Sequence, residues 1–291
     1  MHQSISRITS SCDVEEFDEI VQLDEELDGF LDQWTEGLAD LNGQLLDRLY
    51  GYVDLIDTTA PLMLSLMLLT RIRTEVPAFL ATTDYGNLVG ELLVKLDTSL
   101  ETVGRYLGRI YPESGTDIIR MKDEIRQAAL SVRTYLLGSG IEATYVAPIE
   151  QVLQQHILAR STKAEFRRSL KELLVKEGLS TRSLNTYASD ALYQFSRSYT
   201  LNVSESVGAR YYYYMGTRID TTRKFCSDRL GRAYPKKQVE GWADLKWAGR
   251  IPGTTAQSIF WYVGGYNCRH RLLPVSRAMY EYINSEANQT T

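Results

Sequence analysis

A stripe of apolar residues near the N-terminus constrains the fold of this chain more than any other feature. Its members recur at intervals of three and four residues, the spacing that places side chains along one face of an α-helix: Leu23, Leu27, Phe30, Trp34, Leu38, Leu41, Leu45 and Leu49. Acidic residues fill the positions between them, and we expect these to form a solvated helix face: Asp24, Glu25, Asp28, Asp32, Glu36, Asp40 and Asp47. The pattern predicts a long amphipathic helix whose outer side is strongly acidic.

Comparable spacing predicts further helices along most of the chain. They are expected at about 54–80, 86–110, 116–137, 145–159, 162–178 and 180–205. Pro61 and Pro77 should mark the ends of the first of these, and the Gly-Ser-Gly sequence at 138–140 should break the helical region. Thr162 and Glu165 have the spacing of a capping box, which opens a helix. The N-terminal region is therefore expected to be helical.

The residue pattern changes after about residue 207. Residues 209–215 include four consecutive tyrosines and are typical of a β-strand, since aromatic side chains favour a pleated, half-buried surface. Successive side chains of a strand point to opposite faces, so about two of the four tyrosines should be buried. Residues 266–275 are a second strand candidate, and a short helix is expected from Ser276 to about Ser285. The sequence thus predicts a mainly α fold with a small C-terminal α+β module.

Charge divides the chain into two parts. Its 291 residues contain 32 Lys and Arg against 37 Asp and Glu, for a formal net charge of −5. Residues 1–120 hold 22 acids and 8 bases, a net charge of −14, and residues 121–291 hold 15 acids and 24 bases, a net charge of +9. We predict an acidic helical region at 1–160, a module at 161–276, and a short helix with a polar tail at 277–291. Two different partner surfaces are expected, the basic one for a polyanion.

Composition excludes several classes of protein. With 44% hydrophobic and 24% charged residues, the chain has the apolar content of a globular protein and not of a disordered one. The longest apolar run, at 60–69, is shorter than the roughly 20 residues that cross a bilayer. Residues 1–30 are acidic where a signal peptide would be apolar. Because three cysteines make no disulfide framework, we expect a soluble protein made in a reducing compartment.

Basic residues concentrate in the C-terminal module, interleaved with aromatic residues such as Trp242, Trp247 and Trp261. Cations of this kind bind phosphates, while aromatic rings stack on bases. The candidate DNA-facing residues are Arg223, Lys224, Arg229, Arg232, Lys236, Lys237, Arg269 and Arg271. No motif of an RRM, a KH domain or a zinc finger is present, so sequence-specific recognition is not expected.

Cys226, Cys268 and His270 form the one group with the chemistry of a metal site. Cys268 and His270 should lie on the same side of an extended segment, because side chains alternate along a strand. Two sulfurs and one nitrogen, with Asp220 or a water as the fourth ligand, would suit zinc. Two other interpretations stay open: the cysteines pack as small buried hydrophobes, or Cys226 and Cys268 lie close enough to oxidise.

The familiar signatures of catalysis are missing from the sequence. It contains no Gly-rich phosphate loop with a following Lys, no nucleophile elbow and no HExxH motif. Three histidines leave few candidates for general acid–base catalysis. The sequence therefore favours a protein without enzymatic activity. The alternative is a zinc-dependent hydrolase or nuclease that uses Cys226, Cys268 and His270 for the metal and Asp220 or Asp228 as the base.

Four short motifs follow one another in the C-terminal third of the chain, at 209–215, 220–226, 230–234 and 265–272. They read Ala-Arg-Tyr-Tyr-Tyr-Tyr-Met, Asp-Thr-Thr-Arg-Lys-Phe-Cys, Leu-Gly-Arg-Ala-Tyr and Gly-Tyr-Asn-Cys-Arg-His-Arg-Leu. In order and spacing they resemble the C-terminal domain of the phage head morphogenesis proteins, the Mu F-like minor head protein family. The resemblance covers about 180–276, and His270 stands where many members have a second cysteine.

Four polar or small residues within these motifs are expected to have structural roles. Asp220 and Thr222 can pin their loop by accepting hydrogen bonds from nearby backbone N–H groups. Gly231 permits a positive φ at a turn. Asn267 is expected to satisfy buried backbone groups beside the Cys-Arg-His segment.

The resemblance implies a minor virion protein that is assembled in the host cytoplasm and lies inside the capsid at the portal vertex, near the packaged DNA. It implies a part in head morphogenesis, with genome packaging or ejection as further roles, and multiple copies around the portal. The helical N-terminal region would then dock on the portal or other head proteins. A stand-alone DNA-binding protein is a third hypothesis, which the net charge of −5 disfavours.

Overall fold

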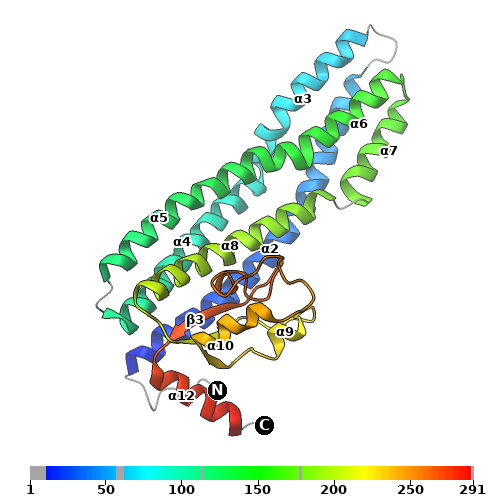
Figure 1. Cartoon of the computed structure of the whole chain (residues 1–291). Helices are drawn as coiled ribbons and strands as arrows, with labels where there is room; N and C mark the ends of the chain where they lie inside the picture. The colour runs from blue at the N-terminus through cyan, green and yellow to red at the C-terminus, as the bar shows by residue number, and fades with distance from the viewer. Residues whose placement is uncertain (1–10, 57–61, 113–114, 177–178, 290–291) are drawn as a thin grey trace. The chain divides into compact units, whose positions relative to one another are not determined.

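The chain folds into two compact units, each assembled from separated stretches of sequence. The computed structural model describes residues 11–56, 62–112, 115–176 and 179–289. Unit 1 consists of Met1–Phe30, Val94–Ala129 and Ser189–Thr291, and unit 2 consists of Leu31–Leu93 and Leu130–Ala188. The predicted class is confirmed, since the described residues are mainly helical and carry one small antiparallel sheet in the C-terminal region (Figure 1). The boundaries at 160 and 276 stay predictions.

Seven α-helices precede the sheet within the described residues: α2 (Ser11–Leu55), α3 (Leu62–Thr82), α4 (Asp84–Ile110), α5 (Gly115–Thr134), α6 (Ala147–Leu158), α7 (Lys163–Lys171) and α8 (Leu179–Ser206). Each predicted helical segment has a helix among the described residues, whereas the predicted boundaries at Pro61 and at 178 lie outside them. The capping box is confirmed, because the Thr162 side chain accepts from the Glu165 N–H and the Glu165 side chain accepts from the Thr162 N–H. No helix among the described residues has the length and apolar character needed to cross a membrane.

Two predicted helix ends are wrong. Pro77 lies inside α3, which continues to Thr82. The sequence at 138–140 does not break the chain's helical course, since π-helical turns at Tyr135–Ser139 and Glu142–Val146 join α5 to α6. A π-turn accommodates one extra residue within a helix, and here it keeps the apolar side chains of Leu136, Ile141 and Tyr145 buried. Burial of this apolar face therefore outweighs the weak helix propensity of the two glycines.

Unit 2 is a helical packing built on the apolar stripe. All eight stripe residues are buried, and the five from Trp34 to Leu49 belong to unit 2, where Trp34 packs against Tyr85 at a ring-centroid distance of 5.6 Å. The polar groups inside are neutral. Tyr145 donates to Asn42 Oδ1 at 3.0 Å, Asn42 donates to the Leu174 carbonyl at 3.2 Å, and Tyr85 donates to the Leu136 carbonyl at 2.9 Å.

Unit 1 contains the sheet, whose strand order is β2-β1-β3. The strands are β1 (Tyr211–Met215), β2 (Ala233–Pro235) and β3 (Arg271–Val275), and both pairings are antiparallel. In this register Tyr213 lies between Ala233 and Leu273. Within the described residues the module also holds the short helices α9 (Lys224–Ser227), α10 (Lys236–Gly241) and α11 (Ile259–Tyr262), and the predicted C-terminal helix follows it as α12 (Arg277–Gln289).

The alternation of side chains along β1 divides the core of unit 1 into two parts. Tyr213 and Met215 join one cluster with residues of α2, α4, α5, α8 and α12. Tyr212 and Tyr214 join a second cluster with α9, α10, α11 and Cys268. Two tyrosines are fully buried, as predicted. The sheet thus separates a helical core from a small loop-rich core that contains the candidate site.

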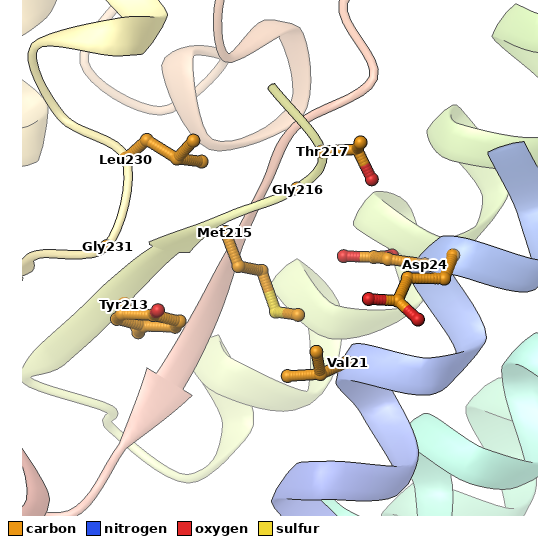
Figure 2. Close-up of a pocket in the computed structure, with 9 residues that line it drawn as sticks. Val21, Asp24, Tyr213, Met215, Gly216, Thr217, Leu230 and Gly231 are labelled. Atoms are coloured by element: carbon orange, nitrogen blue, oxygen red, sulfur yellow. The ribbon is translucent and has the colours of Figure 1, made fainter. Parts of the chain in front are cut away.

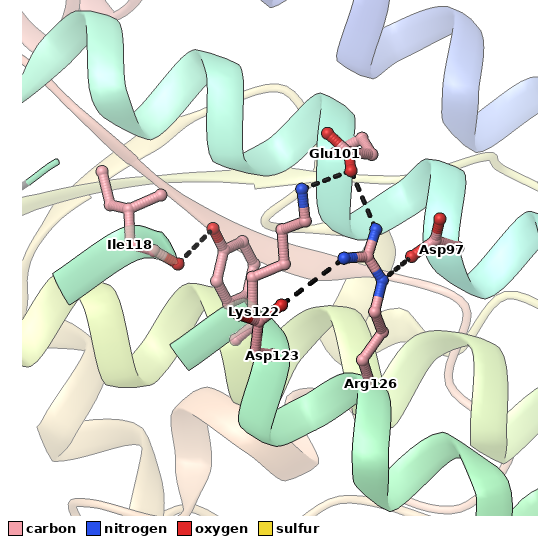
Figure 3. Close-up of polar contacts among 7 residues, drawn as sticks. Asp97, Glu101, Ile118, Lys122, Asp123 and Arg126 are labelled. Atoms are coloured by element: carbon pink, nitrogen blue, oxygen red, sulfur yellow. Dashed lines mark hydrogen bonds and ion pairs between the residues drawn. The ribbon is translucent and has the colours of Figure 1, made fainter. Parts of the chain in front are cut away.

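An ion-pair network connects α4 and α5 within unit 1 (Figure 3). Arg126 donates to Asp97 and, at 2.9 Å, to Glu101, and Lys122 donates to the same Glu101 carboxylate. Nearby, the buried Tyr199 hydroxyl of α8 donates to the Ile118 carbonyl at 3.2 Å. Because the ion pairs are largely exposed they add little stability individually, whereas the buried tyrosine bond fixes α8 against the start of α5.

Candidate metal centre

The three predicted ligand residues lie together in the small core of unit 1. Cys226 is on α9, and Cys268 and His270 belong to the segment that leads into β3. One candidate ligand atom from each lies within 4.8 Å of those of the other two, and all three residues are buried. Cys268 Sγ is 3.6 Å from His270 Nδ1, so the two side chains share one side of the segment, as predicted. We call Cys226, Cys268 and His270 the Cys–Cys–His cluster.

The spacing of this cluster is compatible with a metal site. Zinc binds sulfur at about 2.3 Å and nitrogen at about 2.0 Å with tetrahedral angles, which places a sulfur and a nitrogen ligand about 3.6 Å apart. The observed Sγ···Nδ1 distance of 3.6 Å matches this edge. His270 Nε2 is buried and has no hydrogen-bond partner within the described chain. The imidazole therefore has one hydrogen-bond contact, from Nδ1 to Cys268 Sγ, which a metal ion bound between these two atoms would replace.

Electrostatics favour a thiolate at one of the two cysteines. The pKa of Cys268 is held well below its usual value, because the Cys226 thiol and His270 hydrogen-bond to its sulfur and Arg197 lies nearby. The pKa of Cys226 is raised by its hydrogen bond to Cys268 and by burial. The pair therefore keeps one proton on Cys226 and offers a thiolate at Cys268, which is the form that binds a metal. Both cysteines are free thiols in the structure.

Arg197 of α8 holds the ligand segment in place, and sequence analysis did not identify it. Its buried guanidinium donates to the backbone carbonyls of Cys268, of His270 at 2.9 Å and of Trp261 at 3.3 Å. Three carbonyls bound by one cation fix the course of the chain between α11 and β3. A signal was present in the sequence, because Arg197 lies among polar residues of one helix face at 193, 196, 200 and 204.

Gly264 allows the two cysteines to approach. A Cβ atom at this position would lie 2.3 Å from Cys226 Sγ and 2.8 Å from Cys268 Sγ. Both distances are far shorter than van der Waals contact, so any larger residue would displace the sulfurs. The neighbouring backbone therefore closes one side of the cluster.

A small pocket opens on another side of the cluster. Its volume is about 30 Å³, enough for a water molecule. Besides the cluster, its walls include Thr222, Arg223, Asn267 and Arg269, and no carboxylate lines it. Asp220 does not belong to the group of potential ligands among the described residues. Of the two fourth ligands expected from sequence, the arrangement accommodates the water.

The motif residues next to the cluster have mostly local roles. Thr222 Oγ1 accepts from the Ile219 N–H at 2.8 Å and so pins its loop, as predicted. Gly231 has a φ of +78°, as predicted for its turn. Asn267 is exposed, and its φ of +53° shows a left-handed turn, which asparagine tolerates; the hydrogen-bonding role predicted for its side chain stays a prediction. Asp220 is exposed in the same loop as Thr222.

Two of the predicted DNA-facing residues form ion pairs within unit 1. Arg271 is 1% exposed and forms an ion pair with Asp24 of α2. Arg269 is half-buried and pairs with Asp28 at 3.3 Å. The expectation for Arg271 is therefore wrong, and Arg269 has an internal counter-charge. The remaining six candidates, at 223, 224, 229, 232, 236 and 237, are exposed or half-buried at the surface.

The same ion pairs correct the interpretation of the acidic helix face. Asp24 and Asp28 are buried and not solvated, because Arg271, Arg269 and the hydroxyl of Tyr193, which donates to Asp28 at 2.7 Å, surround them. Burial raises the pKa of Asp24 to about 6, although Arg271 acts in the opposite direction. The charge pattern of the sequence could not show this, since alternate acids on a helix look alike whether or not a partner covers them.

Asp24 also lines a pocket of about 210 Å³ between α2 and β1 (Figure 2). Val21 and Met215 give the pocket apolar walls, and Thr217 lies on its far side from Val21. No member of the Cys–Cys–His cluster lines it. This pocket is therefore separate from the candidate metal centre.

Comparison with known proteins identifies no relative. No protein family matches the chain, no characterised protein matches its sequence, and no solved structure matches its fold. Any function must therefore be argued from the residues of this chain.

Proposed function

We propose that this protein is a minor structural protein of a tailed bacteriophage head, bound to the portal inside the capsid and close to the packaged DNA. In this role it assists head morphogenesis, with genome packaging or ejection as further steps, and multiple copies surround the portal vertex. The observation that carries the proposal is the motif series at 209–272, which resembles the Mu F-like minor head proteins. Residues of these motifs that are distant in sequence contribute to one core around Cys226, Tyr214 and Cys268.

We further propose that the Cys–Cys–His cluster binds zinc as a structural ion. The donor set, the 3.6 Å edge and the readily ionised Cys268 support zinc. A bound ion would join α9 to the segment before β3, two parts of the module separated by about forty residues. Zinc in such small cores contributes folding free energy. A structural metal ion is therefore consistent with the proposed role as a structural protein of an assembly.

A zinc-dependent hydrolase or nuclease is the second candidate, since three protein ligands with a water in the fourth position also occur in catalytic sites. Such an enzyme needs a general base within hydrogen-bond reach of that water. No carboxylate lines the pocket beside the cluster, and Asp228 forms an exposed ion pair with Lys224. These observations support the proposal of a protein without enzymatic activity.

The proposal is tested on virions of the phage that encodes the chain. Mass spectrometry of purified particles should detect the protein in a few copies, and a reconstruction should place it at the portal vertex inside the capsid. Its absence from both virions and portal complexes would refute the proposal, as would a position on the outer shell or at the tail tip. A nuclease or hydrolase activity that zinc restores and Cys268→Ser abolishes would favour the second candidate.

A further inference from the structure

A groove on the surface of unit 1 combines cations with an apolar floor. Its volume is about 500 Å³, within the range of ligand sites. The groove lies between α9 and the segment at 245–248, and we call it the basic groove. It is lined by Arg223, Lys224, Phe225, Asp228, Arg229, Leu245, Lys246, Trp247 and Ala248.

Charge in the basic groove is strongly positive. Four of the nine lining residues are cationic and one is acidic. The acid, Asp228, is 3.1 Å from the Lys224 ammonium. Lys224 and Lys246 are both exposed. The single acid therefore offsets one of the four cations through an exposed ion pair, and a net positive charge stays available to an anionic ligand.

The two arginines of the groove are held in fixed positions. Arg223 donates to the Tyr266 carbonyl at 2.6 Å and lies against Gly249, where a Cβ would be 2.4 Å from its Nε. Arg229 donates to the Phe225 carbonyl at 2.7 Å and stacks on the Phe225 ring at 3.8 Å. A guanidinium fixed in this way loses little side-chain entropy when its remaining N–H groups bind a ligand.

The floor of the groove is equally rigid. The rings of Phe225 and Trp247 stack with centroids 4.0 Å apart and an interplanar angle of 17°. The Trp247 indole donates to the Gly264 carbonyl at 2.9 Å, which anchors it to the backbone beside the Cys–Cys–His cluster. Leu245, 43% exposed, extends the apolar surface. Phe225 is buried and supports the floor, while Trp247 and Leu245 offer contact to apolar parts of a ligand.

From this arrangement we infer that the basic groove binds the phosphodiester backbone of nucleic acid. Phosphates pair with the arginine forks and the lysines, and the apolar floor packs against the sugars. No strand of the described sheet lines the groove, so it lacks the backbone edge that extended peptides use for recognition. The inference rests on the proposed function, in which this module lies near packaged DNA, and it assigns that contact to one site.

The experiment uses the purified full chain with fluorescent DNA of about 20 nucleotides, in duplex and single-stranded form. Anisotropy is measured from low to physiological salt. We expect binding that weakens as salt rises, since phosphate contacts release counterions. The double variant Lys224→Gln with Lys246→Gln should lower the magnitude of the log–log salt slope by about two and reduce affinity at low salt by about tenfold or more.

A matched control removes the same charge elsewhere. Arg168→Gln with Lys171→Gln changes two exposed cations of unit 2 and should leave affinity nearly unchanged. Three results would overturn the inference: no binding of either DNA form, equal losses in both double variants, or equally tight binding of polyglutamate, which would indicate an acidic protein partner. Detection of the chain in virions together with any of these results would spare the proposed function and refute the groove alone.

Discussion

The two units of this protein bury different kinds of groups. Among the described residues, the polar or charged side chains that are buried number twelve, and Asn42 alone of these belongs to unit 2. The charged ones, Asp24, Asp28, Arg197 and Arg271, all belong to unit 1, together with His270 and the two free thiols. Unit 2 keeps its ion pairs at the surface, as Arg73 does with Glu142 at 3.3 Å.

Unit 2 is therefore held together by apolar packing, whereas unit 1 also depends on buried ionic and polar contacts. Apolar helix faces and neutral hydrogen bonds are enough to hold unit 2 together, and they tolerate exchange of one apolar residue for another of similar volume. Buried charges are costly unless their partners are in place. Unit 1 retains four of them around the segment that carries the Cys–Cys–His cluster, so its geometry depends on complete polar networks.

The largest expected effect concerns the buried arginine of unit 1. Arg271→Met removes the partner of Asp24 and leaves a buried carboxylate without its counter-charge, which should lower the free energy of unfolding by about 3–5 kcal/mol. The matched change in unit 2, Arg73→Met, removes a 63% exposed guanidinium and should cost less than about 1 kcal/mol. Urea denaturation followed by circular dichroism gives both values. Equal costs would break the distinction between the units.

Zinc should stabilise the protein by a comparable amount through unit 1. The purified chain should bind about one zinc ion, and at a free concentration 1,000 times its Kd the ion should add about 4 kcal/mol to the free energy of unfolding. Cys268→Ser should abolish this gain, while Cys12→Ser, outside the cluster, should retain it. His270→Cys supplies another zinc ligand and should also retain it. Stability that is unaffected by zinc in the parent chain would contradict a structural metal.

The pH dependence of stability should show the buried carboxylate of unit 1. The native pKa of Asp24, about 6, lies above its ordinary value of 3.8. The native state therefore holds a proton that the unfolded chain releases, and the free energy of unfolding falls as pH rises from about 4 to about 6, by up to about 3 kcal/mol.

Other carboxylates contribute to the same pH profile, so the test compares two chains. The pKa values of Glu75, Glu101 and Glu165 are lowered by hydrogen bonds and ion pairs, which produces the opposite slope at lower pH. Asp24→Asn removes the Asp24 contribution and leaves these unchanged. The difference in the free energy of unfolding between parent and variant should fall as pH rises from about 4 to about 6. A difference that does not vary with pH would show that Asp24 is ionised normally in the native state.

Much of the fold could be predicted from the sequence, because helix periodicity and strand alternation act locally. The stripe from Leu23 to Leu49 predicts α2, and the tyrosine run predicts β1 with its two faces. The glycines at 138 and 140 led to a wrong prediction of a helix break. Weak helix propensity is a local property that the sequence shows, whereas the burial of Leu136 and Ile141 depends on residues far away in the sequence. Long-range packing decided the outcome there.

For the candidate site, too, the sequence predicted the residue types but not the long-range contacts. Residue chemistry alone grouped Cys226, Cys268 and His270, since few other side chains bind metals. The partners that position and surround the site were missed. Arg197 and Asp24 are distant in sequence from their partners, and an arginine or aspartate on a helix is usually solvated. The sequence does not show which charged residues form buried ion pairs after folding.

The smallest effect tests whether unit 2 is stabilised locally. Thr162→Ala removes the capping box that begins α7 and should cost about 1 kcal/mol. Thr74→Ala is the matched control. Thr74 lies within α3, and its hydroxyl donates to the Thr70 carbonyl of the same helix at 3.2 Å, so the substitution should cost under about 0.5 kcal/mol.

Hydrogen exchange shows which unit loses stability in Thr162→Ala. If unit 2 opens independently, amides of α7 exchange faster in Thr162→Ala while those of β1 keep their protection. If β1 loses protection equally, the units unfold as one, and the buried charges of unit 1 and the apolar core of unit 2 stabilise a single cooperative structure.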